Sequence, residues 1–262
     1  MSINTSASNK GSSQKNTMKK AWTTLITNTA FLPGLLTLEY SLRRINSKYP
    51  LLVLYTDSFP ADGHSTLNTR ATSASTTAGP SSHPFSLVEY ERVVQLDSDM
   101  VVLQNIDELM DLELVPPGMG GAGNRVFAAS HACVCNPLHK VHYPKDWVPT
   151  NCAYTAQTQE APPTTGLGIP NGGLQSLLAD LFYGRWVALP YVYNALKTLR
   201  WEGVHDSIWR DENLKNVHYI LSPKPWDDGY DDGNQQLQEP LHEWWFAVNQ
   251  ERLKEERNQG LE

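Results

Sequence analysis

Two aspartates, Asp97 and Asp99, flank a single serine at the end of a short apolar stretch of the sequence. The stretch, residues 92–96, has the composition of a buried β-strand. In open α/β sheets, ligands bind beyond the carboxyl ends of such strands. Carboxylate oxygens there suit Mg²⁺ or Mn²⁺, which proteins commonly bind through one or two carboxylates together with the phosphates of a substrate. Because Asp-x-Asp also arises by chance in surface turns, the pair alone leaves both alternatives open.

A histidine and a lysine near the end of the chain form a second candidate group. His218 lies in the apolar stretch 217–221, and Lys224 follows it six residues later. A neutral imidazole can complete a mixed oxygen and nitrogen site for Mn²⁺, and a lysine can neutralise a phosphate as a point charge. Each residue also has an ordinary alternative, a hydrogen-bonded core histidine in one case and a solvated surface lysine in the other.

A third group of metal-binding side chains lies in a loop-like segment. A zinc site there would draw on His131, Cys133, Cys135, His139 and His142. Structural zinc loops prefer two to four residues between their cysteines, whereas one residue separates Cys133 from Cys135. A loop whose Cys and His residues are incidental is therefore the favoured interpretation, and zinc is the alternative.

The apolar pattern around these groups predicts a βαβ unit at the start of the domain. Residues 22–27 and 51–56 are rich in β-branched and apolar side chains, as buried strands are. Between them, apolar residues recur at every third or fourth position of 31–45, the pattern of an amphipathic helix. Asn28 can cap this helix, and Pro33 is tolerated in its first turn. A strand, a helix and a strand in this order are typical of a parallel sheet.

Farther along the chain the pattern predicts shorter elements. Residues 61–84 contain almost no large apolar side chain, which predicts a stretch without regular structure. A short helix is expected over 106–112 and a strand over 126–129. A helix over 174–182 and a last strand over 217–221 complete the prediction.

The composition is that of a folded domain with an acidic end. Of 262 residues, 40% are hydrophobic and 10% aromatic, enough for a core. Residues 227–262 contain ten acidic and three basic side chains, a balance of −7 that equals the net charge of the whole chain. The rest of the chain is therefore neutral overall, which argues against a nucleic-acid partner.

Cysteine use and the N-terminal segment predict a cytoplasmic protein. The three cysteines cannot all pair within one molecule, which fits a reducing compartment. Residues 1–20 are rich in Ser, Asn, Thr and Lys without an apolar centre, which predicts a disordered leader rather than a secretory signal. No apolar run reaches the ~18 residues of a membrane span, so no membrane partner is expected.

Five segments of the sequence resemble glycosyltransferase family 8, which includes glycogenin and galactinol synthase. In family order they are residues 21–31, 94–109, 171–174, 193–194 and 217–226. One such segment is weak evidence, whereas five in order are strong. The resemblance implies an α/β fold, a single Rossmann-like GT-A domain over 21–226 whose mostly parallel central sheet is flanked by helices. Residues 227–262 would then be an acidic tail.

The resemblance also implies roles for individual residues. The metal, Mn²⁺ or Mg²⁺, would be held by Asp97, Asp99 and His218. The UDP-sugar would contact Thr24, Leu25, Thr27, Asn28, Phe31, Ser98, Gly173 and Lys224. Catalysis would involve Asp99, Lys224, Asn171 and Asp180. Phe31 stands where glycogenin has a stacking tyrosine, so that base stacking is kept and the hydroxyl is not.

The implied reaction is Mn²⁺-dependent transfer of a hexosyl group, with retention, from UDP-glucose or UDP-galactose to a hydroxyl acceptor. A divalent ion would neutralise the diphosphate as the glycosidic bond breaks. Since no side chain clearly suits a covalent nucleophile, front-face attack by the acceptor is favoured, with Asp180 as the carboxylate to test. The acceptor would be a polyol, a saccharide or a protein tyrosine, for which Tyr183, Tyr191 and Tyr193 are available.

Two segments depart from the family pattern. Family members carry a lysine shortly before the Asp-x-Asp strand, whereas this chain has none between Lys48 and Lys140. The segment 171–174 also runs directly into Gln175, where the family has a strand, a helix and an aspartate in between. These departures predict irregular or missing segments near 61–84 and 174–175. The alternative function is accordingly a catalytically impaired nucleotide-sugar-binding homologue, or a truncated gene model.

Overall fold

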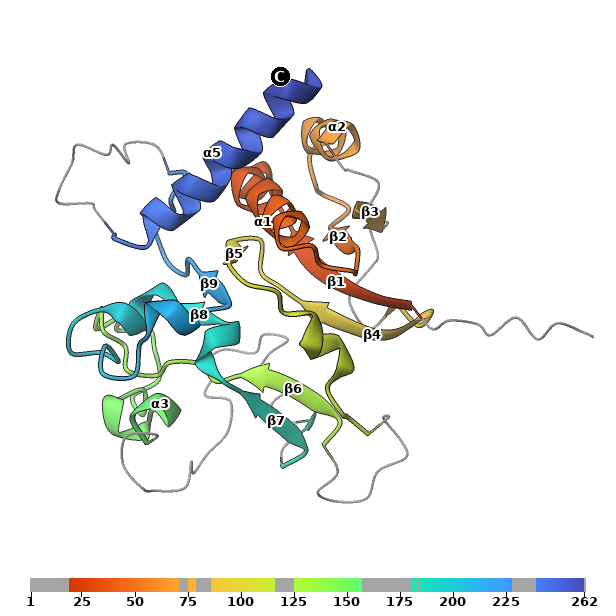
Figure 1. Ribbon diagram of the computed structural model, residues 1–262. Coiled ribbons are helices and arrows are strands. Elements are labelled where there is room, and N and C mark those ends of the chain that lie inside the picture. The colour runs from red at the N-terminus through yellow and green to blue at the C-terminus, as the bar shows by residue number, and fades with distance from the viewer. Residues whose placement is uncertain are drawn as a thin grey trace, which may run out of the picture.

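A four-stranded parallel sheet forms one half of the molecule (Figure 1). The structure is a computed structural model that describes residues 19–70, 75–78, 86–115, 125–156, 181–182, 184–227 and 239–261. The strands, in the spatial order β3-β2-β1-β4, are β1 (Lys19–Ile26), β2 (Leu51–Tyr55), β3 (Ser75–Ala78) and β4 (Tyr90–Gln95). All three pairings are parallel, so the carboxyl ends of these strands lie at one edge.

The helix α1 (Leu32–Arg44) connects β1 to β2, as the apolar pattern predicted. A short 3₁₀ helix, η1 (Thr29–Phe31), precedes it, and Asn28 caps η1 by accepting a hydrogen bond from the Ala30 amide at 3.0 Å. Pro33 lies in the first turn of α1, where its missing amide hydrogen costs no intrahelical bond. The predicted place of Pro33 in the first turn is therefore confirmed, whereas Asn28 caps η1 and the N-cap residue of α1 is Phe31, which makes no side-chain cap hydrogen bond.

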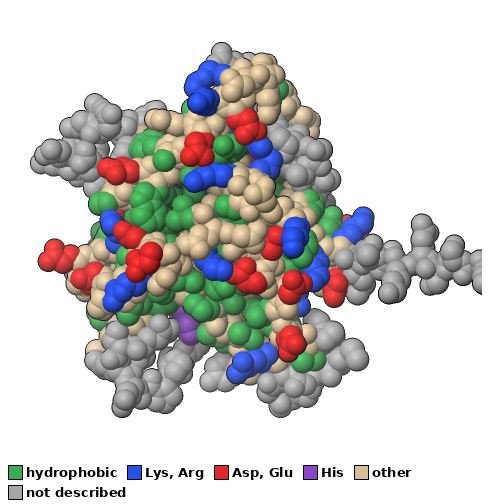
Figure 2. Space-filling view, viewed as in Figure 1, with side chains coloured by type: hydrophobic (Ala, Val, Ile, Leu, Met, Phe, Trp, Pro, Cys, Tyr) green, Lys and Arg blue, Asp and Glu red, His purple; other side chains and the backbone are tan. Residues whose placement is uncertain are grey.

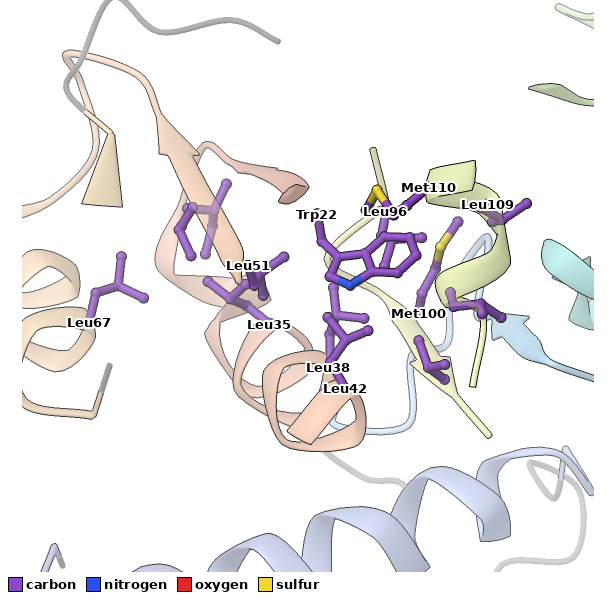
Figure 3. Packing of buried hydrophobic residues seen from close by; sticks show 14 of the residues in the cluster. Trp22, Leu35, Leu38, Leu42, Leu51, Leu67, Leu96, Met100, Leu109 and Met110 are labelled. Atoms are coloured by element: carbon purple, nitrogen blue, oxygen red, sulfur yellow. The ribbon is translucent and has the colours of Figure 1, made fainter. Parts of the chain in front are cut away.

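The main hydrophobic core lies between α1 and the sheet. Figure 3 shows Leu38 and Leu42 of α1 near the Trp22 ring of β1, and Leu35 of the same helix beside Leu51. Trp22 is fully buried, and its indole nitrogen donates a hydrogen bond to Ser47 at 2.8 Å. Burial of these side chains fixes the direction in which β1 and the neighbouring β4 deliver the residues that follow them.

A second, three-stranded sheet carries the late part of the chain. Its strands, in the order β5-β9-β8, are β5 (Met100–Val102), β9 (Asn216–His218) and β8 (Ala195–Leu196). Strand β9 runs antiparallel to β5, with Met100 opposite His218. Since β5 begins directly after Asp99, this register places His218 beside the aspartate pair.

The remaining elements surround these two sheets. The parallel pair β6 (Phe127–Ser130) and β7 (Trp186–Leu189) lies at the opposite end of the molecule from the last helix (Figure 1). The short helices are η3 (Asp107–Asp111), η4 (Pro149–Asn151), α3 (Ala153–Ala156), η5 (Tyr191–Tyr193), η6 (Lys197–Arg200) and η7 (Asp211–Asn213). The predicted short helix near 106–112 and the strand near 126–129 are thus confirmed.

The acidic end of the chain contains the helix α5 (His242–Gln259), which lies against α1 (Figure 1). Arg43 of α1 binds Glu255 of α5 at 2.7 Å, and Trp245 is only 2% exposed. A stretch expected as an acidic tail therefore packs onto the body of the molecule. Among the described helices, none is both long enough and apolar enough to cross a membrane.

Three further sequence expectations were wrong. Lys19 and Lys20, which were assigned to the disordered leader, are the first residues of β1. Part of the stretch 61–84 is ordered, because α2 (Ala61–Arg70) buries Leu67 and β3 pairs with β2. Strand pairing uses the backbone, so β3 needs none of the apolar side chains on which the prediction relied. The last strand ends at His218 rather than Leu221, whose φ of 64° takes the backbone out of the extended conformation. The predicted helix 174–182 lies almost entirely outside the described residues.

The surface in Figure 2 mixes charges of both signs. Lys and Arg side chains alternate there with Asp and Glu, and apolar side chains lie between them. Among the described residues on this face, neither sign forms a broad patch. Long-range attraction of a polyanion to this face is therefore weak.

Candidate active site

The aspartate pair occupies the turn between β4 and β5. The turn is fixed by its backbone, since the Met100 amide donates to the Asp97 carbonyl at 3.1 Å and the Tyr219 amide donates to the Asp99 carbonyl at 2.9 Å. The Leu96 amide donates to the Thr23 carbonyl of β1 at 2.8 Å, which extends the sheet up to the turn. The Asp-x-Asp sequence therefore stands at the carboxyl edge of the parallel sheet, as predicted.

His218 faces both aspartates. Its Nε2 lies 3.1 Å from Asp99 Oδ1 and 3.5 Å from Asp97 Oδ2. The three side chains offer two carboxylate oxygens and one imidazole nitrogen, all within 4.8 Å of one another. This is the mixed oxygen and nitrogen set that Mn²⁺ accepts, and it draws on residues 119 positions apart in the sequence. The residues present therefore fit a divalent cation.

Asn194 orients the imidazole ring from the other side. Its Oδ1 lies 2.9 Å from His218 Nδ1, which leaves Nε2 directed at the aspartates. A group that holds the second nitrogen of a metal-binding histidine fixes the ring and its tautomer. The residue-by-residue reasoning did not select Asn194, although segment 193–194 was one of the five that carry the family resemblance.

Lys224 adds a positive charge to the same site. Its ammonium group lies 2.5 Å from Asp99 Oδ2 and 2.7 Å from the carbonyl oxygen of Tyr219. The ammonium also lies 5.7 Å from the centre of the Phe31 ring, in the loop that follows β1. The lysine is thus held between the turn at residues 97–99, the candidate metal-binding turn, and the end of the first strand rather than solvated at the surface.

Charge compensation determines the ionisation of the site. Burial would raise the pKa of Asp99, but its hydrogen bond and charge interaction with His218, together with Lys224, lower that pKa to about 2. Burial would lower the pKa of His218, and the hydrogen bond and charge of Asp99 instead raise it. Asp99 is therefore ionised throughout the physiological pH range and available as a ligand.

The residues expected to bind the nucleotide lie at the carboxyl end of β1. Leu25 is 43% exposed, and Thr27 and Asn28 are exposed after the strand. Thr24 is buried, and its hydroxyl has no hydrogen-bond partner among the described residues. The indole nitrogen of Trp226 donates to the Ala30 carbonyl at 2.9 Å, which joins the segment that carries Lys224 to this end of β1.

The other predicted site residues divide into two groups. Ser98 is buried in the metal-binding turn, between the two aspartates. Asn171, Gly173 and Asp180 lie outside the described residues, as does the junction at Gln175. Of the predicted site residues, the structure therefore brings Asp97, Asp99, His218 and Lys224 together at one edge of the sheet.

Replacing Asn194 with alanine is expected to weaken Mn²⁺ binding by about 10- to 100-fold, because His218 loses the contact that directs its Nε2. Calorimetry with Mn²⁺ alone measures this change. Asn105→Ala is the matched control, since the side-chain oxygen of Asn105 also has a hydrogen-bond partner, the Asp107 amide at 2.9 Å, but lies outside the candidate site. Equal losses of affinity in the two variants would contradict the role of Asn194.

Comparison with known proteins relates the chain to sugar-transferring enzymes. No protein-family model matches it. Galactinol synthase 3 of Arabidopsis thaliana is 24% identical over 288 residues, which cover 90% of this chain and 83% of that protein. Human glycogenin-1 is 26% identical over 276 residues, which cover 88% of this chain and 72% of glycogenin-1.

A solved structure shares the fold. The apo form of the glycosyltransferase GlyE of Streptococcus pneumoniae superposes with a TM-score of 0.57 at 20% sequence identity. The match covers 93% of this chain and 64% of the GlyE chain, so this chain spans less than two thirds of that relative. At this identity the likeness establishes the architecture alone, a parallel sheet with covering helices.

Proposed function

We propose that this family 8-like glycosyltransferase, with its GT-A fold, transfers a hexosyl group from a UDP-sugar to a hydroxyl acceptor in a Mn²⁺-dependent reaction. One observation carries the proposal. Asp97, Asp99 and His218 converge with Lys224 at the carboxyl edge of the sheet, next to the end of β1. That edge is where open α/β sheets bind their ligands.

The proposed roles follow from the positions of the side chains. Asp97, Asp99 and His218 would hold the cation, which would supply positive charge to the departing diphosphate. Lys224 provides a second positive charge beside the same turn, and its short contact with Asp99 keeps it there before the donor binds. Mg²⁺ is the alternative cation, because carboxylate ligands suit both ions.

The contacts of the donor are proposed from the family resemblance. The uridine would contact Thr24, Leu25, Thr27, Asn28 and Phe31, and the sugar would contact Asn171, Gly173 and Asp180. UDP-glucose and UDP-galactose are the donors to test first, with transfer that retains the anomeric configuration through front-face attack.

A free hydroxyl compound is favoured as the acceptor, either a polyol or a saccharide. The other candidate acceptor is a tyrosine of the chain itself, and of the three named above, Tyr191 and Tyr193 are described by the structure. The hydroxyl of Tyr191 donates to the Ile208 carbonyl, and that of Tyr193 donates to Glu108, both at 3.0 Å. Each of these phenols would have to give up a hydrogen bond before it could accept a sugar.

Release of UDP tests this function. The full chain is incubated with UDP-glucose or UDP-galactose and with polyol or saccharide acceptors, and UDP is measured with and without Mn²⁺. Release is expected only with Mn²⁺; it should stop when EDTA is added and resume when excess Mn²⁺ is restored. Mass spectrometry of the same samples detects transfer to the protein itself. Calorimetric binding of UDP without release would instead favour the catalytically impaired homologue.

Replacing Lys224 with methionine is expected to lower kcat/KM for the donor by about 100-fold, since the diphosphate loses a fixed positive charge. Mn²⁺ should still bind the variant at least as tightly, because the ammonium competes with a cation for Asp99 Oδ2. Steady-state kinetics and calorimetry measure the two effects separately.

Lys215→Met is the matched control for this variant. Its ammonium also contacts a carboxylate, that of Glu108, and lies 5.2 Å from an aromatic ring, that of Tyr193, outside the candidate active site. Donor kinetics that fall equally in both variants would contradict the role of Lys224.

A further inference from the structure

Three thiols and an imidazole converge at a place that the proposed function does not use. The sulphur atoms of Cys133, Cys135 and Cys152 and a ring nitrogen of His205 all lie within 4.8 Å of one another. His205 Nε2 is 3.1 Å from Cys135 Sγ and 3.3 Å from Cys152 Sγ. None of the four belongs to the candidate active site.

The geometry is close to that of a tetrahedral metal centre. Zn²⁺ binds sulphur at about 2.3 Å and nitrogen at about 2.0–2.1 Å, so ligand atoms in a tetrahedron lie roughly 3.5–3.8 Å apart. The contacts of 3.1 and 3.3 Å and the limit of 4.8 Å bracket this spacing. A small adjustment of side-chain rotamers therefore suffices to place four ligands around one ion.

The surroundings of the cluster are apolar and buried. Cys152 is 1% exposed and His205 is 4% exposed, and both lie in a part of the chain with few regular elements. Tyr154 packs edge-on against the His205 ring at 5.6 Å, and Trp209 is buried in the same cluster of side chains. Cys133 and Cys135 are half-buried, and the apolar side chains around the cluster limit the access of water to a metal centre.

A disulfide explains the cluster less well than a metal does. All three cysteines are free, and pairing any two would leave the third thiol beside His205 without a role. The three sulphur atoms and one imidazole nitrogen, all within 4.8 Å of one another, are the donor set of a structural zinc centre. The imidazole comes from a segment 53 residues beyond Cys152, so the four groups meet only through the fold.

The structure corrects the zinc alternative considered for the sequence. His139 and His142 are exposed and take no part in the cluster. His131 is buried, but its ring packs against Trp186 at 4.9 Å. Of the five residues, only Cys133 and Cys135 belong to the cluster. The Cys-x-Cys spacing is shorter than zinc loops prefer, yet both sulphurs lie within 4.8 Å of the other two ligand atoms.

We propose that this chain binds one structural Zn²⁺ ion, with the ligands Cys133, Cys135, Cys152 and His205. Four protein ligands leave no open position, which marks a structural site rather than a catalytic one. The ion would join the loop that carries the three cysteines to the segment that follows η6. This proposal does not depend on glycosyl transfer, and the metal content of the purified protein tests it.

Metal analysis of the full chain, purified without chelators under reducing conditions, provides the first test. About one zinc per chain is expected. Because the carboxylate site also binds divalent ions, the protein is then loaded with Co²⁺ in place of zinc. Thiolate-to-cobalt charge-transfer absorption is expected and should persist in an Asp99→Asn variant, since carboxylates and imidazole alone do not produce it. Absence of both zinc and this absorption would overturn the proposal, as would a disulfide found by mass spectrometry.

Two variants assign the ligands. Cys152→Ser is expected to lose the zinc and the cobalt absorption, whereas His142→Ala, which removes an exposed histidine from the same loop, keeps both. If Cys152→Ser does not fold, titration of the wild-type thiols with a mercurial reagent replaces it. One zinc should then be released as the three thiols react, and release of no zinc would count against the site.

Discussion

Replacing Asp99 with asparagine is expected to lower Mn²⁺-dependent UDP release by about 1,000-fold. Both carboxylate oxygens are in use, one facing His218 at 3.1 Å and the other facing Lys224. The amide nitrogen of asparagine cannot bind a cation, and the change leaves Lys224 without its anionic partner. Kinetics of UDP release, with calorimetry of Mn²⁺ binding, measure the loss.

Asp107→Asn is the matched control for this variant. Asp107 is also buried and also uses both oxygens, which accept from the Ser47 hydroxyl at 2.6 Å and from the Lys48 amide at 2.9 Å. It should lower the free energy of unfolding and leave Mn²⁺ affinity unchanged. An Asp99→Asn enzyme that keeps activity within tenfold of wild type would rule out the proposed metal site.

The second large effect is expected from a glycine in α1. A β-carbon added at Gly34 would lie 2.5 Å from the backbone oxygen of Ser98 and 2.5 Å from the Trp226 ring. Helix α1 therefore touches the back of the metal-binding turn at a point that tolerates no side chain. Gly34→Ala is expected to lower the free energy of unfolding by about 3 kcal/mol. It should also weaken Mn²⁺ binding, because Ser98 must move.

Gly63→Ala in α2 is the control that separates the cost of the steric clash from the gain in helix propensity. Gly34→Ala and Gly63→Ala each gain about 1 kcal/mol of intrinsic helix stability, because alanine replaces glycine in a helix. At Gly63, however, the added carbon meets the side chains of Phe59 and Thr29 rather than backbone. Those side chains can shift, so denaturant unfolding should show a much smaller loss than for Gly34→Ala. A Gly34→Ala protein as stable as wild type would show that the turn is not held by this contact.

The first half of the fold could be predicted from local pattern. Three of its features depend only on a few neighbouring residues. They are the β-branched run of β1, the spacing of apolar residues by three and four in α1, and the cap at Asn28. Strand β3 was missed because it is defined by backbone pairing with β2, which leaves little trace in side-chain composition.

The candidate site was predictable only as far as its segments resembled a family. Asp97, Asp99, His218 and Lys224 were selected correctly as neighbours because the resemblance linked segments that are distant in sequence. The cysteine cluster had no such guide. Cys152 and His205 come together through tertiary contacts, and close spacing in sequence pointed instead to histidines at the surface.

The segment from Asn194 to His205 has a further consequence for how this sequence can vary. Asn194 at its start orients His218, and His205 at its end faces the cysteines. Between them, β8 and η6 are buried, and Lys197 is tied to the Pro223 carbonyl at 2.8 Å. Because both ends of this stretch make contacts of this kind, a change in the number of residues between them would displace Asn194 or His205. Insertions and deletions should be tolerated in the exposed loop around Val141 and eliminated here.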